Sequence, residues 1–422
     1  MIDIRKLRDD PEAMRAALAG KGAAAALDDI LALDEQRRRV LAEAQALKTR
    51  RNRVSKTIGA AIKAGEDARE QQQAVRELGG RIRALDAEAT EIEARLEDAL
   101  LRIPNPPHAT TPAGPDAAAN REVRVHGEPR ACTETDRPHW DLGEQLGWFD
   151  FPRAARMTGA GFPLLRGTGA RLQRALIQFM LDLHVSEHGY QEVAPPCLCN
   201  RAAMTGTGQL PKMEDDMYRI ESDDLFLIPT GEVPLTNLFR EEIIEEPLPV
   251  KLTACTPCFR REAGAAGRDT RGLNRVHQFE KVELVQLVEP QRSYDALESL
   301  VGEAEAVLQR LELTYRIMAL CSGDLSFAAA KCYDIEVWAP GQAAWLEVSS
   351  CSNFEDFQAR RAGIRYRDAQ GRAAYVHTLN GSGVALPRLL VALMEQHQQA
   401  ENRVHVPEAL RPYLGGARDL GG

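Results

Sequence analysis

The sequence predicts an α+β protein in which an N-terminal antiparallel helical hairpin precedes a larger domain, built on an antiparallel or mixed sheet flanked by helices. Three observations predict this fold class. Apolar residues recur at alternating steps of three and four in two long segments, a short polar turn separates these segments, and strand-like runs after residue 138 follow one another without intervening helices. With 422 residues, 44% of them hydrophobic, the chain can bury two substantial cores.

The hairpin is predicted from two apolar seams. The clearer seam runs through residues 75–99, and a more broken seam that includes two arginines precedes it at residues 33–61. Each helix is expected to span about 30 to 35 residues, roughly 50 Å. The polar turn at residues 63–67 should fold the second helix back on the first, giving a coiled-coil arm.

One helix of this arm is strongly basic, since residues 44–63 carry six cations and no acid. Solvated charges on a dimerising coiled coil are the alternative interpretation. Six uncompensated cations repel one another, however, and a phosphate backbone would convert that cost into affinity through counterion release. Because the arm lacks aromatic residues, it is suited to the shape and backbone of structured RNA. The cations are Lys48, Arg50, Arg51, Arg53, Lys56 and Lys63, and the first five are the candidate RNA contacts.

Three prolines within residues 104–107 end the arm, and a loop rich in Ala, Pro, Thr and Gly follows at residues 110–120. We therefore expect an RNA-binding arm at residues 1–103 and a second domain at residues 104–422, in which residues 104–135 form a linker and loop.

Composition limits the location and the partners of the chain. Eight scattered cysteines and no export signal favour reduced thiols and a cytoplasmic location, and no segment approaches the roughly 20 apolar residues of a membrane span. Cys255 and Cys258 supply only two of the four ligands of structural zinc, so no zinc is expected. The net charge of -9 disfavours indiscriminate nucleic-acid binding, with the arm as a local exception.

In the second domain a helix is expected at residues 170–187, and phosphate-binding side chains cluster in two predicted strands, residues 250–262 and 278–288. Neither GTGQLPKM nor GSGVAL fits a P-loop or dinucleotide fingerprint, so side chains must meet any phosphates. Strand alternation puts Arg260 and Glu262 on one face, and Phe279, Lys281 and Glu283 on one face of the next strand. A guanidinium suits phosphate oxygens, a phenyl ring suits a purine, and a carboxylate suits an amine or hydroxyl. Further strands are predicted at residues 225–229, 333–339, 344–350 and 373–379.

Two smaller clusters lie in or beside such strands. If their segment is extended, Thr230 and Glu232 point the same way and offer a hydroxyl and a carboxylate to a small amine, although a capped turn would also explain them. Glu347 and Ser349 are expected to share a strand face, where the carboxylate could hold Mg²⁺.

A glycine-bearing loop is expected at residues 380–383, leading into a helix with Arg388 in its first turns. A helix N-terminus and an arginine together attract anions. An ordinary capped helix with one surface arginine is the alternative.

At these residues the sequence resembles class II aminoacyl-tRNA synthetases, and specifically the seryl-tRNA synthetases of bacteria. The resemblance covers essentially the whole chain. The matching segments, in family order, are MIDIRKLRDDPE, IPNPP, HWDLGE, ARLQRALIQFML, HGYQEVAPP, GTGQLPK, IPTGEVPLTN, CFRREAG, GRDTRGLNRVHQFEKVEL, LEVSSCSN and LNGSG.

The resemblance implies a class II antiparallel sheet flanked by helices, and a homodimer whose interface is built by HGYQEVAPP. It implies that L-serine is activated with ATP and Mg²⁺ to seryl-adenylate and transferred to the 3′ end of tRNA(Ser), commonly also to tRNA(Sec). A non-catalytic paralogue that keeps the arm is one alternative. A ligase that charges a carrier protein is another, but such ligases lack the arm.

The resemblance also assigns roles to residues. The catalytic residues are Arg260, Glu283 and Arg388. The serine-binding residues are Thr230, Gly231, Glu232, Glu283 and Ser382. The ATP-binding residues are Arg260, Arg261, Glu262, Arg275, Val276, His277, Gln278, Phe279, Glu347, Val348, Ser349, Ser350 and Arg388, with Mg²⁺ on Glu347. Two positions depart from the family pattern. Gly231 is usually alanine. Arg261 is often serine; it belongs to the ATP-binding segment by position, but its side chain should face away from Arg260 and no chemical step is assigned to it.

Overall fold

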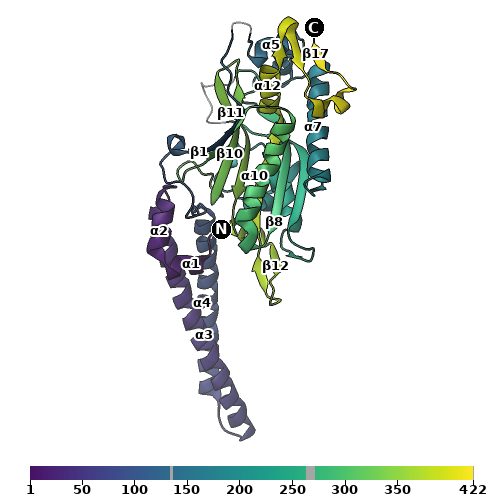
Figure 1. The fold of residues 1–422 in the computed structure, drawn as a ribbon. Helices are drawn as coiled ribbons and strands as arrows, with labels where there is room; N and C mark the ends of the chain where they lie inside the picture. Colours follow the sequence, from purple (N-terminus) through teal and green to yellow (C-terminus); the bar gives the residue numbers. More distant parts are fainter. Residues whose placement is uncertain (134–135, 263–270, 422) are drawn as a thin grey trace. The chain divides into compact units, whose positions relative to one another are not determined.

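The computed structural model describes residues 1–133, 136–262 and 271–421, and the chain divides into two compact units, Met1–Pro104 and Asn105–Gly422 (Figure 1). The sequence also predicts a glycine-bearing loop, which includes Arg268, between the two strands of the phosphate site. This loop lies largely outside the described residues, as does the end of the predicted linker at residues 134–135.

The first unit is helical. Its helices are α1 (Ile4–Asp9), α2 (Pro11–Ala19), α3 (Leu27–Lys63) and α4 (Arg69–Leu101). Helices α3 and α4 form the predicted hairpin, closed by residues 64–68, and Val40 and Ala44 of α3 pack against Leu85, Ala89 and Ile92 of α4. The prediction of a helical arm is confirmed.

Burial along the hairpin is uneven. In the first half of α3, Leu27, Ile30, Val40 and Ala44 are buried, whereas farther along the helix Val54 and Ile58 are only half-buried and Ile62 is 55% exposed. The distal part of the hairpin therefore gains little from apolar packing.

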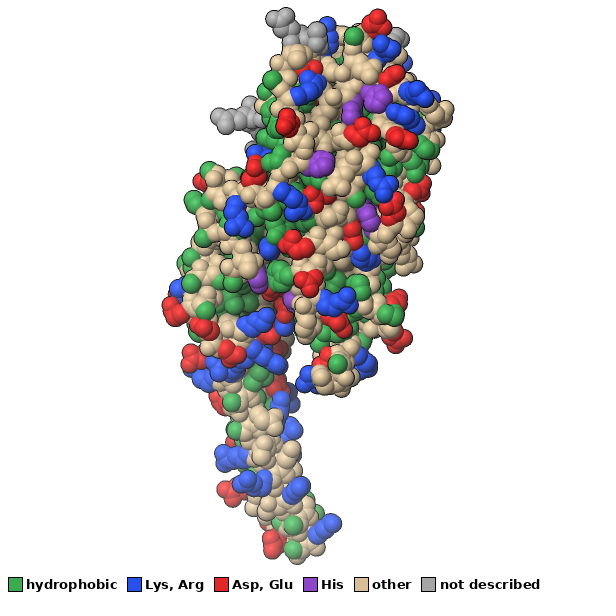
Figure 2. All heavy atoms as spheres, in the orientation of Figure 1, with side chains coloured by type: hydrophobic (Ala, Val, Ile, Leu, Met, Phe, Trp, Pro, Cys, Tyr) green, Lys and Arg blue, Asp and Glu red, His purple; other side chains and the backbone are tan. Residues whose placement is uncertain are grey.

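The cationic helix is compensated at one position. Lys48 forms a 2.8 Å ion pair with Asp86 of α4, so the expectation of six uncompensated cations is wrong for this lysine, because the acidic second helix lies within its reach. Arg50, Arg53 and Lys56 are exposed. Among the charged side chains on the visible distal face of the hairpin, Lys and Arg are more frequent than Asp and Glu (Figure 2).

The second unit is built on an eight-stranded sheet of order β1-β9-β10-β11-β14-β8-β7-β2, antiparallel except for the β2–β7 pair. The fold class prediction is confirmed. Its strands are β1 (Arg121–His126), β2 (Gln191–Glu192), β7 (Val250–Phe259), β8 (Gln278–Val288), β9 (Tyr315–Ala319), β10 (Lys331–Ala339), β11 (Ala344–Asn353) and β14 (His377–Ala385).

One face of this sheet packs on helices α7, α10 and α12 and forms the main core. Strand β8 shows the alternation: Val282 and Leu284 enter that core, while Lys281 and Glu283 face the other side. The helices of this unit are α5 (His139–Gln145), α6 (Phe151–Thr158), α7 (Thr168–Ser186), α8 (Arg201–Thr207), α9 (Glu232–Thr236), α10 (Ser293–Arg310), α11 (Phe357–Ala362) and α12 (Leu386–Gln396).

Three small sheets complete the unit, with the orders β3-β5-β4, β13-β12-β6 and β15-β16-β17. Their strands are β3 (Leu198–Asn200), β4 (Arg219–Ile220), β5 (Leu225–Leu227), β6 (Ile243–Ile244), β12 (Arg365–Arg367), β13 (Ala373–Tyr375), β15 (Gln398–Gln399), β16 (Arg403–His405) and β17 (Asp419–Gly421).

The glycine-bearing segment 380–383 is not a loop, and that prediction is wrong. These residues lie inside β14, where Gly381 pairs with Leu284 and Ser382 with Glu283. A Cβ on Gly381 would lie 2.9 Å from the Cys351 sulfur, so here glycine permits close packing within the sheet. The predicted strand 373–379 is likewise divided between β13 and β14.

Candidate active site

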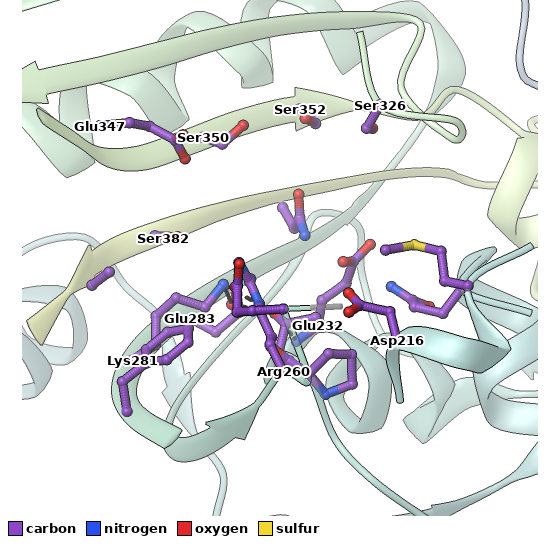
Figure 3. A pocket seen from close by; sticks show the side chains of 18 of the residues that line it. Asp216, Glu232, Arg260, Lys281, Glu283, Ser326, Glu347, Ser350, Ser352 and Ser382 are labelled. Carbon is purple, nitrogen blue, oxygen red and sulfur yellow. Dashed lines mark hydrogen bonds and ion pairs between the residues drawn. The ribbon is translucent and has the colours of Figure 1, made fainter. Parts of the chain in front are cut away.

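A cavity of about 470 Å³ opens on the face of the large sheet opposite the main core (Figure 3). Strands β8, β11 and β14 supply one set of lining residues, and α9, the segment after β7 and the start of α12 supply others. Most of the residues predicted for the site line this cavity. They are Thr230, Glu232, Arg260, Glu262, Arg275, Val276, Phe279, Glu283, Glu347, Val348, Ser350, Ser382 and Arg388.

A buried group of four side chains, Thr230, Glu232, Lys281 and Glu283, forms what we call the carboxylate cluster. The Thr230 hydroxyl donates to Glu283 Oε2 at 2.7 Å, and Lys281 Nζ donates to Thr230 Oγ1 at 3.0 Å. Lys281 also forms an ion pair with Glu283, which is 1% exposed. The cluster thus holds a carboxylate in a fixed position away from water.

Glu232 reaches the cluster from α9, which begins at this residue. Gly231 has helical angles of φ -62° and ψ -18°, so the Thr-Gly-Glu segment is not extended. Of the two possibilities left open by the sequence, the turn is the one found, because the backbone enters α9 at the glycine. Both Thr230 and Glu232 still line the cavity. A Cβ on Gly231 would lie 3.0 Å from Glu283 Cβ, closer than most real contacts.

The surroundings of Glu232 favour its protonated form. Burial, and then the charge of Glu283, raise its pKa to about 7, although hydrogen bonding and the ammonium of Lys281 act in the opposite direction. Glu232 Oε1 accepts from Gln358 Nε2 at 2.6 Å. This carboxyl can therefore change charge near neutral pH.

Strand β11 contains a register shift that rearranges its side chains. Ile335 pairs with Ser349 but Glu336 pairs with Glu347, so Val348 is an extra residue. The prediction that Glu347 and Ser349 share a face is wrong for this reason. Glu347 and Ser350 line the cavity, whereas Ser349 is 1% exposed and donates to the Ser382 carbonyl at 2.7 Å.

Arg260 lies just beyond β7, which ends at Phe259. The prediction that Arg260 and Glu262 share a strand face is wrong, because the chain leaves the sheet there and Glu262 has a positive φ of 51°. Arg260 is held instead by contacts: its Nε donates to the Pro229 carbonyl at 3.3 Å, and its guanidinium lies 5.2 Å from the Phe279 ring centroid.

His277 and Gln278 do not line the cavity. The His277 carbonyl accepts from the Arg260 amide at 2.9 Å, and His277 Nδ1 lies 3.0 Å from the Arg260 carbonyl. His277 therefore fixes the backbone that carries Arg260. Gln278 is exposed at the start of β8.

Two further arginines face the cavity, each beside an acid, and we call them the arginine pairs. Arg275 Nη1 donates to Glu262 Oε2 at 2.7 Å. Arg388 Nη1 donates to the Glu347 carbonyl at 2.7 Å and lies 3.8 Å from its carboxylate. These arginines are 46% and 27% exposed, so they remain available to a polyanion. Arg261 points elsewhere, since its guanidinium donates to the Asp215 carbonyl at 3.0 Å.

The chemistry around Glu347 suits a hard cation. The Glu347 carboxylate lines the cavity, and its charge, together with burial, raises the pKa of the neighbouring Asp334. The hydroxyl of Ser350 lies on the same side of the cavity (Figure 3). Carboxylate and hydroxyl oxygens are the ligands that Mg²⁺ prefers. In the described parts of the chain, no group of three or more His, Cys, Asp or Glu side chains is arranged to hold a metal by itself.

Three polar residues of the site were given no role on the basis of sequence. Lys281 was expected on the face of Glu283, and that alternation was its only signal. Gln358 and Asn380 form hydrogen bonds with Glu232 from α11 and β14, and no local sequence pattern indicates them.

No helix in residues 1–133, 136–262 or 271–421 is long and apolar enough to cross a membrane.

The fold and the cavity define a class II aminoacyl-tRNA synthetase. A family model described as the tRNA synthetase class II core domain (G, H, P, S and T) matches residues 214–397, and one described as the seryl-tRNA synthetase N-terminal domain matches residues 1–107. The chain belongs to the seryl-tRNA synthetase family, as the sequence predicted, and it is an aminoacyl-tRNA ligase.

Similar proteins span the whole chain. The serine–tRNA ligase of Thermomicrobium roseum is 55% identical and is aligned over 100% of this chain and 95% of its own length. That of Pelotomaculum thermopropionicum is 53% identical over 100% of both chains. The crystal structure of seryl-tRNA synthetase from Pyrococcus horikoshii complexed with ATP has a TM-score of 0.95 at 37% identity, covering 100% of this chain and 99% of that one.

Proposed function

We propose that this enzyme joins L-serine to tRNA(Ser) in two steps, through a seryl-adenylate made from ATP. The observation that carries the proposal is the presence, in one cavity, of a buried carboxylate cluster and of exposed arginines. The first is suited to a small ammonium and hydroxyl, and the second to a triphosphate. The names of the full-length relatives, and the ATP complex of the Pyrococcus horikoshii relative, agree with this.

In the first step, a serine carboxylate oxygen attacks the α-phosphorus of ATP, the bond from phosphorus to the bridging oxygen breaks, and pyrophosphate leaves. Arg260 binds the serine carboxylate and the α-phosphate, while Arg275 and Arg388 hold the other phosphates. Phe279 supplies a ring face for the adenine. In the second step, a ribose hydroxyl at the tRNA 3′ end attacks the adenylate carbonyl, and AMP leaves.

We propose that Mg²⁺ accompanies ATP, with the Glu347 carboxylate and the Ser350 hydroxyl as its protein ligands. When bound, the ion neutralises charge on the phosphate oxygens.

Serine selection rests on the carboxylate cluster. Glu283 and Glu232 are suited to the hydroxyl and the ammonium of serine, with Ser382 opposite Glu283 in register. Alanine would leave these buried acceptors unpaired, which is a costly mismatch. Gly231 shapes the backbone between Thr230 and Glu232.

The helical arm is proposed to bind the tRNA. Exposed Arg50, Arg53 and Lys56, with half-buried Arg51, support this role, and Lys48 contributes if its ion pair with Asp86 opens. The compact unit that ends at Pro104 supports a division into an arm at residues 1–103 and a catalytic domain at residues 104–422. We further propose a homodimer formed through residues 188–196, and the charging of tRNA(Sec) as in many members of the family.

Pyrophosphate exchange tests the proposal directly. The chain is incubated with ATP, Mg²⁺, labelled pyrophosphate and each of the twenty amino acids, without tRNA. Exchange that depends on serine alone is the expected result. Exchange with another amino acid, or with none, would overturn the proposed substrate.

A further inference from the structure

Lys281 is a buried cation within the carboxylate cluster, and none of the roles proposed above uses it. It is 7% exposed and lies in β8 two residues before Glu283, on the same face. A buried lysine is costly unless it is paired. Its ion pair with Glu283 and its 3.0 Å hydrogen bond to Thr230 offset the free energy of burying the ammonium.

The hydrogen bonds fix the proton of Thr230. An ammonium only donates, so Thr230 Oγ1 must accept from Lys281. The same oxygen lies 3.3 Å from the Glu232 amide, which also donates to it. Both lone pairs are then used, and the hydroxyl proton can only point to Glu283 Oε2. Thr230 therefore has no bonding capacity left for a substrate, and it acts by orienting Glu283.

The charges of the carboxylate cluster also indicate a role for Lys281. Glu232 and Glu283 face one another's charge in a buried site, with Lys281 as the ammonium beside them. With both carboxylates ionised the formal charge of the three groups is -1, which the serine ammonium would bring to zero. Without Lys281 the formal charge of the two carboxylates would be -2. Protonation of a carboxylate would then be favoured and would compete with binding of the serine ammonium.

We propose that Lys281 is a positioning residue of the serine pocket, which orients the Glu283 carboxylate through the Thr230 hydroxyl and keeps both carboxylates available to the serine ammonium. The inference rests on the proposed function. It predicts that loss of the ammonium weakens serine binding selectively and leaves ATP binding intact.

The test compares Lys281→Met with Lys251→Met in serine-dependent pyrophosphate exchange. Lys251 is the matched control, because it lies in the adjacent strand β7 and forms a 2.6 Å ion pair with buried Glu303, outside the cavity. Lys281→Met should raise the serine KM by about 10- to 100-fold, the range for a buried group left without its partner. The ATP KM should stay within about twofold, as should both constants of Lys251→Met.

A pH profile separates positioning from simple loss of packing. The charged groups that most affect the pKa of Glu232 are Glu283 and Lys281 of β8, whereas α11 and β14 contribute the neutral amides of Gln358 and Asn380. On the Glu283 side lie Arg260 and the Cys258 thiol. Because Lys281 lowers the pKa of Glu232, Lys281→Met should move the acid limb of kcat/KM for serine to higher pH, and Lys281→Arg should restore it.

Thermal unfolding of each variant is measured first. If Lys281→Met does not fold, Lys281→Arg is used for the test instead. This variant should raise the serine KM about fivefold and leave the ATP KM unchanged, because a guanidinium cannot reproduce both hydrogen bonds of the ammonium. Equal losses for serine and ATP, or a wild-type serine KM and acid limb in the folded variant, would overturn the inference. Failure of the unmodified enzyme to exchange with serine would instead overturn the proposed function.

Discussion

The carboxylate cluster and the arginine pairs line one cavity but are built in opposite ways. Glu232 and Glu283 are 7% and 1% exposed, and each has hydrogen-bond partners from other elements. Arg275 and Arg388 are partly exposed, and each is paired with a nearby acid. Exposed ion pairs contribute little to stability and can be exchanged for a phosphate, whereas a buried network cannot rearrange cheaply.

This difference separates two tasks. A buried, fully bonded cluster can reject a substrate that lacks one polar group, because the unmatched acceptor stays buried. Exposed arginines attract any polyanion of suitable size, and salt screens that attraction. We therefore infer that the cluster provides selectivity for the amino acid, and that the arginine pairs provide affinity for the nucleotide.

The largest effect is expected from Glu283→Ala. It leaves Lys281 buried without its partner and removes the acceptor proposed for the serine hydroxyl, so serine-dependent pyrophosphate exchange should fall by about 10³-fold or more in kcat/KM. Glu280→Ala is the matched control, because Glu280 lies in the same strand on the other face and outside the cavity. Near-normal exchange by Glu283→Ala would remove the carboxylate cluster from serine selection.

A second prediction concerns pH, and it uses Glu232, the carboxyl of the carboxylate cluster whose pKa is raised to near neutrality. Burial, and then the charge of Glu283, raise the pKa of Glu232 to about 7, above the ordinary value of 4.5, so the folded protein binds this proton more tightly. The associated stability is fully present below about pH 4.5 and is lost as pH rises through 7, by about 3 kcal/mol in all. Glu232→Gln should remove this part of the pH dependence of urea unfolding.

The same titration should appear in kinetics. The ionised carboxylate is proposed to bind the serine ammonium, so kcat/KM for serine should rise with pH up to about 7 and the ATP KM should not. A profile of kcat/KM for serine in Glu232→Gln that keeps the same limb would assign the titration to another group.

For the arginine pairs we expect a smaller and salt-sensitive effect. Arg275→Ala should raise the ATP KM by about 10- to 50-fold, because a phosphate contact is lost. The serine KM should stay within about threefold, because the hydrogen bond of Arg275 is to Glu262 and not to a member of the carboxylate cluster. Raising the ionic strength should increase the ATP KM of the unmodified enzyme more than that of Arg275→Ala. Equal salt dependence of the two would mean that Arg275 does not meet a phosphate. Arg261→Ala is the control, because its guanidinium donates to the Asp215 carbonyl and neither residue lines the cavity.

The sequence predicts periodic features well and single irregularities poorly. The hairpin and strand β8 are predicted by apolar residues that repeat every 3.5 and every 2 residues, respectively. Many residues contribute to each of these patterns, so a single exception does not hide it. The extra residue at Val348 and the helical turn at Gly231 each change the direction of several side chains, but each arises at one residue. Nothing in the local pattern indicates the extra residue at Val348. At Gly231 the pattern left an extended segment and a turn both open, because tertiary packing decides between them. The partners Gln358 and Asn380 come from distant segments and need the fold itself.

The arm allows the clearest comparison, because three cations of α3, Arg50, Arg53 and Lys56, are exposed and form no ion pairs within the described residues. Arg50, Arg53 and Lys56 can therefore bind a phosphate backbone without breaking an ion pair. Arg275 and Arg388 must first separate from Glu262 and Glu347. Changing all three to alanine should raise the KM for tRNA(Ser) in aminoacylation by about tenfold and lower the slope of log KM against log salt by about 2 to 3. Pyrophosphate exchange without tRNA should be unaffected, and Lys48→Ala should have a smaller effect because Lys48 is already paired with Asp86. An unchanged salt slope in the triple variant would mean that these cations only solvate the hairpin, and that the tRNA is bound elsewhere.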